Sequence, residues 1–327
     1  MKNFNLLSIL IIVILTSSCN KKEKIMKEKY QSFLKEYEAK VRPLYKDAAL
    51  TYFNATITGD ENLYKKYEEI SIKLNEIYAN KEDFNKIKEI KESGIIKGGI
   101  DERIVKLLYN AYLGNQVDTH KLNEITKLQT IVEQKFNTFR AKIDGKEYTD
   151  NELEDILKKS KDSKKLEKAY LSSKEVGALV ADTVIKIVKL RNEVAKELGF
   201  KNYHDMSLIL SEQDPEEIEK LFDELDSLTR GTYIKVKSEM DKILAQQLKI
   251  NETELMPWHY QNRFFQEAPA IYDIDLDEYY KNQDIVKLTK DYYESIGMDI
   301  TDILEKSDLY EKPKKYQHAY CTDIDQE

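Results

Sequence analysis

The sequence predicts a mainly α fold, built as one elongated body of many helices with a short β segment near the C-terminus. Apolar residues recur at steps of three and four through most of the 327 residues. No proline lies between Pro43 and Pro215, and helix-capping residues interrupt the pattern at intervals. Because 41% of the residues are hydrophobic, the chain can bury a sizeable core.

The first helices are indicated by an apolar face and by capping residues. The apolar face of the first helix comprises Met26, Tyr30, Phe33, Leu34, Tyr37 and Val41. Asp60 follows Gly59, and Asp101 comes shortly after Gly98-Gly99, so both are predicted N-caps. Thr149 with Glu152 has the spacing of a capping box. These positions divide the region into several helices.

Two long helices are predicted in the middle of the chain. The first covers about 164–198 and ends at Gly199, which suits a left-handed C-cap. The second begins with Asp214 as N-cap and Pro215 in the first turn, and a bend is expected at Gly231. Its predicted inward-facing residues are Leu221, Leu225, Leu228, Val236, Met240 and Leu244.

Turn and strand signals are few. Asp144-Gly145 is a strong tight-turn signal, which either closes a small hairpin or joins two helices. After about residue 252 the chain carries three of its five prolines and its only tryptophan, which predicts a loop-rich wall. A helix over about 284–296, closed by Gly297, follows. Residues 316–324 are rich in strand-forming side chains and predict a strand.

The first 19 residues are typical of an export signal. Their apolar run over 6–15 is too short to span a bilayer. Residues 16–19 (TSSC) resemble a bacterial lipobox, in which the Cys19 thiol carries diacylglycerol; an ordinary cleaved signal is the alternative. We expect an exported lipoprotein of the bacterial cell envelope, anchored to the membrane through Cys19. Only Cys321 then remains, so no disulfide is expected.

The charge pattern argues against a nucleic-acid partner. Acidic residues outnumber basic ones by 60 to 52, and the two signs are interleaved along the chain. A protein that binds a phosphate backbone needs clustered Lys and Arg, and no such stripe is present in the sequence.

The sequence holds no complete catalytic constellation. The four histidines are scattered, and no pair has the His-x-x-x-His spacing that places two imidazoles on one helical face for zinc. We expect no metal site in these residues. Nothing in the sequence around His120 or His204 indicates a catalytic or binding role. His204 is predicted to lie at the surface or to pack beside a helix end. His259 and Trp258 are predicted to satisfy each other's polar atoms in a buried turn.

His318 is the exception among the histidines. At the start of a strand with a free edge, its imidazole would reach a carbonyl of an extended peptide paired with that edge. An inner strand of a small sheet is the alternative.

Several runs of residues, taken in their order along the chain, resemble the sequences of a known protein family. They are 54–63 (NATITGDENL), 191–193 (RNE), 199–203 (GFKNY), 257–260 (PWHY), 264–269 (FFQEAP), 307–310 (SDLY) and 318–323 (HAYCTD). Together they resemble bacterial members of the angiotensin-converting-enzyme family of zinc peptidases. The resemblance implies an elongated, cleft-type metallopeptidase body, which removes short C-terminal pieces from peptides as a peptidyl dipeptidase. Residues 20–327 would form its single domain, with a helical lid and wall over 20–250 and the cleft wall and start of the catalytic region over 251–327.

The resemblance also implies a substrate-binding segment. In this family zinc is held by a His-Glu-x-x-His helix and a later Glu, and a segment that begins His-Ala lies upstream and binds the substrate peptide along its edge. His318 and Ala319 match this segment, and Cys321 takes its second backbone-pairing place, so all three are expected to bind substrate. Tyr320, Cys321 and Thr322 stand where converting enzymes carry Ser, Ala and Trp, so the side-chain contacts are expected to differ.

The His-Glu-x-x-His motif does not occur in the 327 residues. We therefore expect the N-terminal portion of a peptidase, truncated before that motif, which binds no catalytic zinc and is inactive alone. Its partner would be the C-terminal half, if that half is encoded separately. A non-catalytic helical lipoprotein that binds peptides or a partner chain is the alternative, and an oligopeptidase with the same cleft is a third interpretation.

Overall fold

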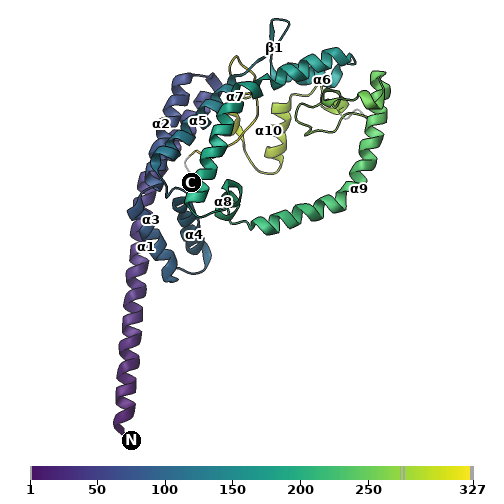
Figure 1. Cartoon of the computed structure of the whole chain (residues 1–327). Coiled ribbons are helices and arrows are strands. Elements are labelled where there is room, and N and C mark those ends of the chain that lie inside the picture. Colours follow the sequence, from purple (N-terminus) through teal and green to yellow (C-terminus); the bar gives the residue numbers. More distant parts are fainter. Residues whose placement is uncertain (1, 273, 275–276, 325–327) are drawn as a thin grey trace.

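Helices dominate the computed structural model, which confirms the mainly α fold class. It describes residues 2–272, 274 and 277–324, with side chains from residue 21 onward (Figure 1). The helices are α1 (Lys2–Thr58), α2 (Glu61–Tyr78), α3 (Lys81–Ser93), α4 (Gly99–Leu113), α5 (Thr119–Thr138), α6 (Asp150–Lys159), α7 (Ser163–Glu197), α8 (Tyr203–Leu210), α9 (Pro215–Leu248), α10 (Ile285–Ser295) and α11 (Thr301–Lys306). Three short 3₁₀ turns are η1 (Glu252–Glu254), η2 (Pro257–His259) and η3 (Asp277–Tyr279). Among the residues with described side chains, no helix is both long enough and apolar enough to cross a membrane.

The Asp144-Gly145 turn closes a hairpin. Strands β1 (Ala141–Ile143) and β2 (Lys146–Tyr148) pair in antiparallel register, with Ala141 opposite Tyr148. Both turn residues have positive φ, 51° at Asp144 and 85° at Gly145, as a two-residue hairpin turn requires.

Most of the predicted helix ends are confirmed. The Asp60 carboxylate accepts the Asn62 N–H at 2.8 Å, and Thr149 with Glu152 forms the capping box. Asp214 caps α9, and Gly199 and Gly297 follow α7 and α10 with positive φ. The predicted N-cap at Asp101 is wrong, because α4 begins at Gly99 with Gly98 at the N-cap position. The Asp101 carboxylate instead accepts the Tyr30 hydroxyl at 3.0 Å.

The core lies between the N-terminal helices and along α7. Helix α1 packs on α2 and α3, α2 packs on α5, and α5 packs on α7. The predicted apolar face of α1 is confirmed, since Met26, Tyr30, Phe33 and Val41 are buried. A second cluster joins α5, α7 and α8, and a third joins β1, α6 and α7. The hairpin and η2 also lie against α7, so this helix links the elements that surround the candidate site.

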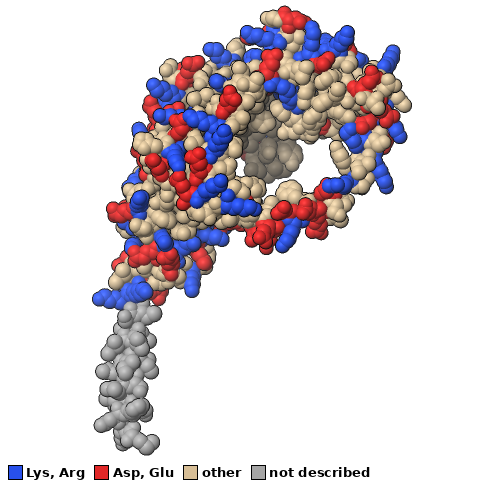
Figure 2. Space-filling model, viewed as in Figure 1, with Lys and Arg blue, Asp and Glu red and all other residues tan. Residues whose placement is uncertain are grey.

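Helix α9 contradicts the prediction for its apolar face. Of the residues expected to face inward, Leu221, Leu225, Leu228 and Val236 are exposed, with Leu228 at 70%, whereas Leu244 is buried. The main contacts of α9 are with its sequence neighbours α8 and η1. It curves away from the other helices (Figure 1), and the space-filling view shows the molecule hollowed between α9 and the rest (Figure 2). Most of the apolar face is exposed because, among the described elements, the main contacts of α9 are with α8 and η1 at its two ends.

The predicted β segment near the C-terminus is also wrong. Residues 316–324 contain no strand, and the sheet of the described residues consists of β1 and β2. A strand needs a neighbouring strand to accept its hydrogen bonds. The segment lies instead beside the end of α1, where the Tyr316 N–H donates to the Thr56 carbonyl at 2.8 Å.

Candidate functional site

The predicted substrate-binding residues lie together on one exposed segment. His318, Ala319 and Cys321 are all exposed, and Cys321 is a free thiol. The His318 imidazole lies beside the Tyr316 ring, with 6.0 Å between the ring centroids. The side chain of the predicted lipid-attachment residue, Cys19, lies outside the described residues.

The last residues of α1 anchor this segment on both sides of His318. Before it, the Tyr316 N–H bonds to the Thr56 carbonyl. After it, the Tyr320 hydroxyl lies 2.6 Å from Thr56 Oγ1, and the Tyr320 ring contacts Tyr52 at a centroid distance of 6.0 Å. Thr56 is only 1% exposed. One buried residue therefore holds both ends of the stretch that presents His318 and Ala319.

Gly59 allows the chain to approach so closely. It follows α1 with φ +67°, and a Cβ added there would lie 2.6 Å from Lys314 Cβ and 2.9 Å from the Lys314 oxygen. A non-glycine residue would meet both a strained backbone and a steric clash. Together with the Thr56–Tyr320 contact, this close approach packs two of the runs that resemble the family, 54–63 and 318–323, against each other.

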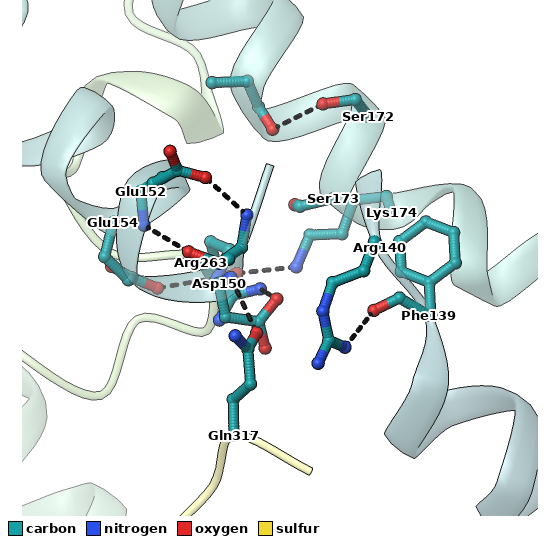
Figure 3. Close-up of polar contacts among 12 residues, drawn as sticks. Phe139, Arg140, Asp150, Glu152, Glu154, Ser172, Ser173, Lys174, Arg263 and Gln317 are labelled. Carbon is teal, nitrogen blue, oxygen red and sulfur yellow. Dashed lines mark hydrogen bonds and ion pairs between the residues drawn. The ribbon is translucent and has the colours of Figure 1, made fainter. Parts of the chain in front are cut away.

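A second set of contacts, a polar network around Arg263, holds Gln317 (Figure 3). Arg263 is largely buried, and its guanidinium bonds to Asp150 Oδ1 at 2.8 Å and to Glu154 Oε1 at 2.7 Å. The backbone N–H of Asp150 donates to Gln317 Oε1 at 2.8 Å. Because Asp150 begins α6, the helix N-terminus, the loop at Arg263 and the segment before His318 are joined at one place.

Two further basic residues complete the network. Arg140 donates to the Lys315 carbonyl at 2.6 Å, which fixes the backbone just before Tyr316. Lys174, on α7, donates to the Arg263 carbonyl at 2.6 Å. Burial, and after it the nearby Arg263 charge, lowers the pKa of the Lys174 ammonium. These contacts position the backbone of the segment that leads to His318.

A pocket lies behind the segment. Its volume is about 510 Å³, and Tyr320, Thr322 and Asp323 form one wall while Tyr45 and Tyr67 of α1 and α2 contribute to the other. The size falls within the usual range for sites that receive a small ligand or a side chain.

The sequence did not indicate the anchoring residues. Arg263, Arg140 and Lys174 are three among 52 basic residues, and nothing in their spacing marks them. Gly59 precedes the predicted N-cap Asp60, but this position does not indicate a close approach of another segment. Only their position relative to the runs that resemble the family sets two of them apart: Gly59 lies within 54–63, and Arg263 lies between 257–260 and 264–269.

The other histidines have structural environments. His259 is 2% exposed; its Nδ1 accepts the Met256 N–H at 2.9 Å and its Nε2 lies 2.9 Å from Ser163 Oγ. The prediction that Trp258 and His259 satisfy each other is wrong, because Trp258 Nε1 is buried without a partner among the described atoms. His204 is exposed, as predicted.

The described residues do not fit a zinc ion. In the described part of the chain no three His, Cys, Asp or Glu side chains are grouped so as to hold a metal. Both ring nitrogens of His259 are engaged, and among the described residues His318 belongs to no group of three such side chains. We therefore derive no metal-assisted step from this geometry.

Comparison with known proteins identifies the family. Residues 24–323 match the peptidase family described as angiotensin-converting enzyme, which covers most of the 327 residues. No curated protein sequence matches the chain. The matched range includes the end of α1, the Arg263 network and the segment that presents His318, so the chain belongs to the angiotensin-converting enzyme family of peptidases.

Proposed function

We propose that the chain forms the peptide-binding wall of a zinc peptidase, of the peptidyl-dipeptidase type, which removes short C-terminal pieces from peptides. The observation that supports this proposal best is the segment 316–321, exposed from His318 onward and anchored at Thr56 and at Asp150, in a chain of this peptidase family. An extended peptide pairs with the backbone at Ala319 and Cys321, and the His318 imidazole donates to a carbonyl held there. Substrate side chains on the inner side enter the pocket beside Tyr320.

The zinc and the groups that activate water come, in this proposal, from residues other than these 327. The partner that supplies them is the C-terminal half of the peptidase. By itself the chain binds peptides, binds no catalytic zinc and hydrolyses nothing.

One purified preparation of the 327-residue chain tests these statements together. Fluorescence anisotropy measures the binding of a labelled peptide, metal analysis measures zinc, and a quenched peptide reports hydrolysis. Replacing His318 by Ala should weaken peptide binding by about tenfold, because a hydrogen bond from a charged or polar group contributes about 1.5 kcal/mol. Ala319→Pro removes the backbone N–H and should weaken it further.

His204→Ala is the matched control, since His204 is also an exposed histidine. It should bind the peptide as the unchanged chain does. Equal binding by the His318 and His204 variants would contradict the peptide-binding role. Stoichiometric zinc or hydrolysis by the chain alone would contradict the assignment of the metal site to other residues.

We further propose that the protein is an exported lipoprotein of the bacterial cell envelope, held on the membrane by a lipid on Cys19. Labelled palmitate should enter the unchanged protein and be absent from Cys19→Ser. Equal labelling of both would overturn the lipid anchor and favour the ordinary cleaved signal.

A further inference from the structure

A second pocket lies away from the His318 segment, between α4, α5, α7 and α8. Its volume is about 520 Å³. Ile125, Val194 and Met206 of the second core cluster form part of its apolar lining. The lining combines these apolar residues with amide and hydroxyl side chains, and concave sites of this size are typical of small-molecule binding.

Arg191 lines this pocket and has no anionic partner. Its guanidinium lies over the Tyr203 ring, 4.8 Å from the ring centroid, and no carboxylate within the described part of the chain forms an ion pair with it. By contrast, Arg103, Arg230 and Arg263 each pair with a carboxylate. An arginine that lines a pocket without a carboxylate keeps its donors free for a ligand.

Neighbouring residues orient the Arg191 side chain. Tyr203 stacks on the guanidinium, and the Tyr203 N–H donates to Asn192 Oδ1 at 3.0 Å. Asn192 follows Arg191 on α7, so the helix fixes both the arginine and the ring beneath it. A guanidinium stacked on a ring keeps its planar fork in one orientation, which suits the two oxygens of a carboxylate.

The rest of the lining carries no negative charge that would pair with Arg191. No Asp or Glu is among the residues that line the pocket; its other polar members are amides and hydroxyls, including Asn75, Gln129 and Ser211. This is notable in a chain where acidic residues outnumber basic ones by 60 to 52. A single cation beside an apolar floor, without an acid to neutralise it, selects for an anion attached to an apolar group.

We propose that this pocket binds a small molecule that combines one carboxylate with an apolar body. The carboxylate bonds to Arg191 in a two-point contact, and the apolar body covers Ile125, Val194 and Met206. The site is separate from the proposed peptide-binding segment, and its test does not depend on hydrolysis.

Isothermal titration of the 327-residue chain with 3-phenylpropionate tests the proposal, with 3-phenylpropanamide and inorganic phosphate as matched probes. The carboxylate should bind saturably, and the neutral amide should bind about tenfold more weakly because it lacks the charge-assisted contact. Phosphate should also bind about tenfold more weakly, because it has no apolar body. Arg191→Gln should weaken 3-phenylpropionate by about tenfold.

Two further variants keep the proposal falsifiable. Arg230→Gln removes an arginine from a surface ion pair on α9 and should leave binding unchanged. Leu107→Trp retains Arg191 but fills the pocket from a half-exposed position, so it should abolish binding while the thermal unfolding of the protein stays the same. Equal binding of acid and amide, equal binding by the Arg191 and Arg230 variants, or no saturable binding to the unchanged chain would each overturn the proposal. Phosphate binding as tight as that of the carboxylate would show an inorganic anion site and would overturn it as well.

Discussion

Helices α3 and α9 differ in what covers their apolar faces. On α3, Ile87 and Ile90 are fully buried between α1 and α4, within a cluster that also contains Phe33 and Tyr112. On α9, Leu228 is 70% exposed, and the middle of the helix borders the open hollow of the molecule (Figure 2). Both helices carry the amphipathic pattern, so the pattern predicts a helix whereas a neighbouring element decides whether its face is buried.

The contrast between the two helices predicts the largest mutational effect. Ile87→Ala should lower the free energy of unfolding by about 2–5 kcal/mol, because it removes buried methyl groups and leaves a cavity. Leu228→Ala should change it by less than about 0.5 kcal/mol, because no described side chain covers the leucine. Urea unfolding followed by circular dichroism measures both. A Leu228→Ala loss as large as that of Ile87→Ala would show that the face of α9 is covered in solution.

A second contrast concerns two glycines, one at the end of α1 and one in α9. Gly59→Ala should destabilise the protein by about 1–3 kcal/mol, since alanine at φ +67° is strained and its Cβ meets Lys314. Gly231→Ala should stabilise it by about 0.5–1 kcal/mol, because alanine favours a helix and nothing lies within 4 Å of the added Cβ.

Limited proteolysis provides an independent readout for the Gly59 variant. Displacing Lys314 loosens the segment anchored at Thr56, so cleavage within 312–322 should become faster. If Gly59→Ala matched Gly231→Ala in both stability and cleavage rate, the docking of this segment on α1 would be contradicted.

Local signals in the sequence predicted much of the fold. Three helices begin after residues whose side-chain oxygen accepts a backbone N–H two or three residues ahead: Asp60, Thr149 and Asp214. This capping contact involves only residues close in the sequence, so the sequence can predict it. The N-cap predicted at Asp101 failed because α4 already begins at Gly99, and the Asp101 carboxylate accepts the hydroxyl of a distant residue, Tyr30. The inward face of α9 and the strand at 316–324 failed for the same reason: each depends on a partner that the local sequence does not specify.

The candidate site was predictable only in part. The family resemblance indicated His318, Ala319 and Cys321, and the structure places them on one exposed segment, although their role in binding stays a prediction. The anchors at Thr56 and Asp150 lie more than 160 residues away in the sequence, as the separations of 264 for Thr56 to Tyr320 and 167 for Asp150 to Gln317 show. Contacts over such separations arise from the packing of whole helices, so spacing along the chain cannot reveal them.

The smallest effect is expected from the contrast between buried His259 and exposed His204. Burial is the main cause that lowers the pKa of His259, and a charge on Glu167 partly opposes it. Nδ1 already accepts the Met256 N–H, so a proton there would also break a hydrogen bond. As the pH falls through the ordinary value of 6.5, the unfolded chain therefore takes up a proton that the folded chain does not, and stability declines. Urea unfolding at about pH 7.5 and about pH 5.5 should show a smaller decline in His259→Gln than in the unchanged chain, whereas His204→Gln should decline as the unchanged chain does. An equal decline in the two variants would mean that His259 takes up its proton as readily in the folded protein as in the unfolded one.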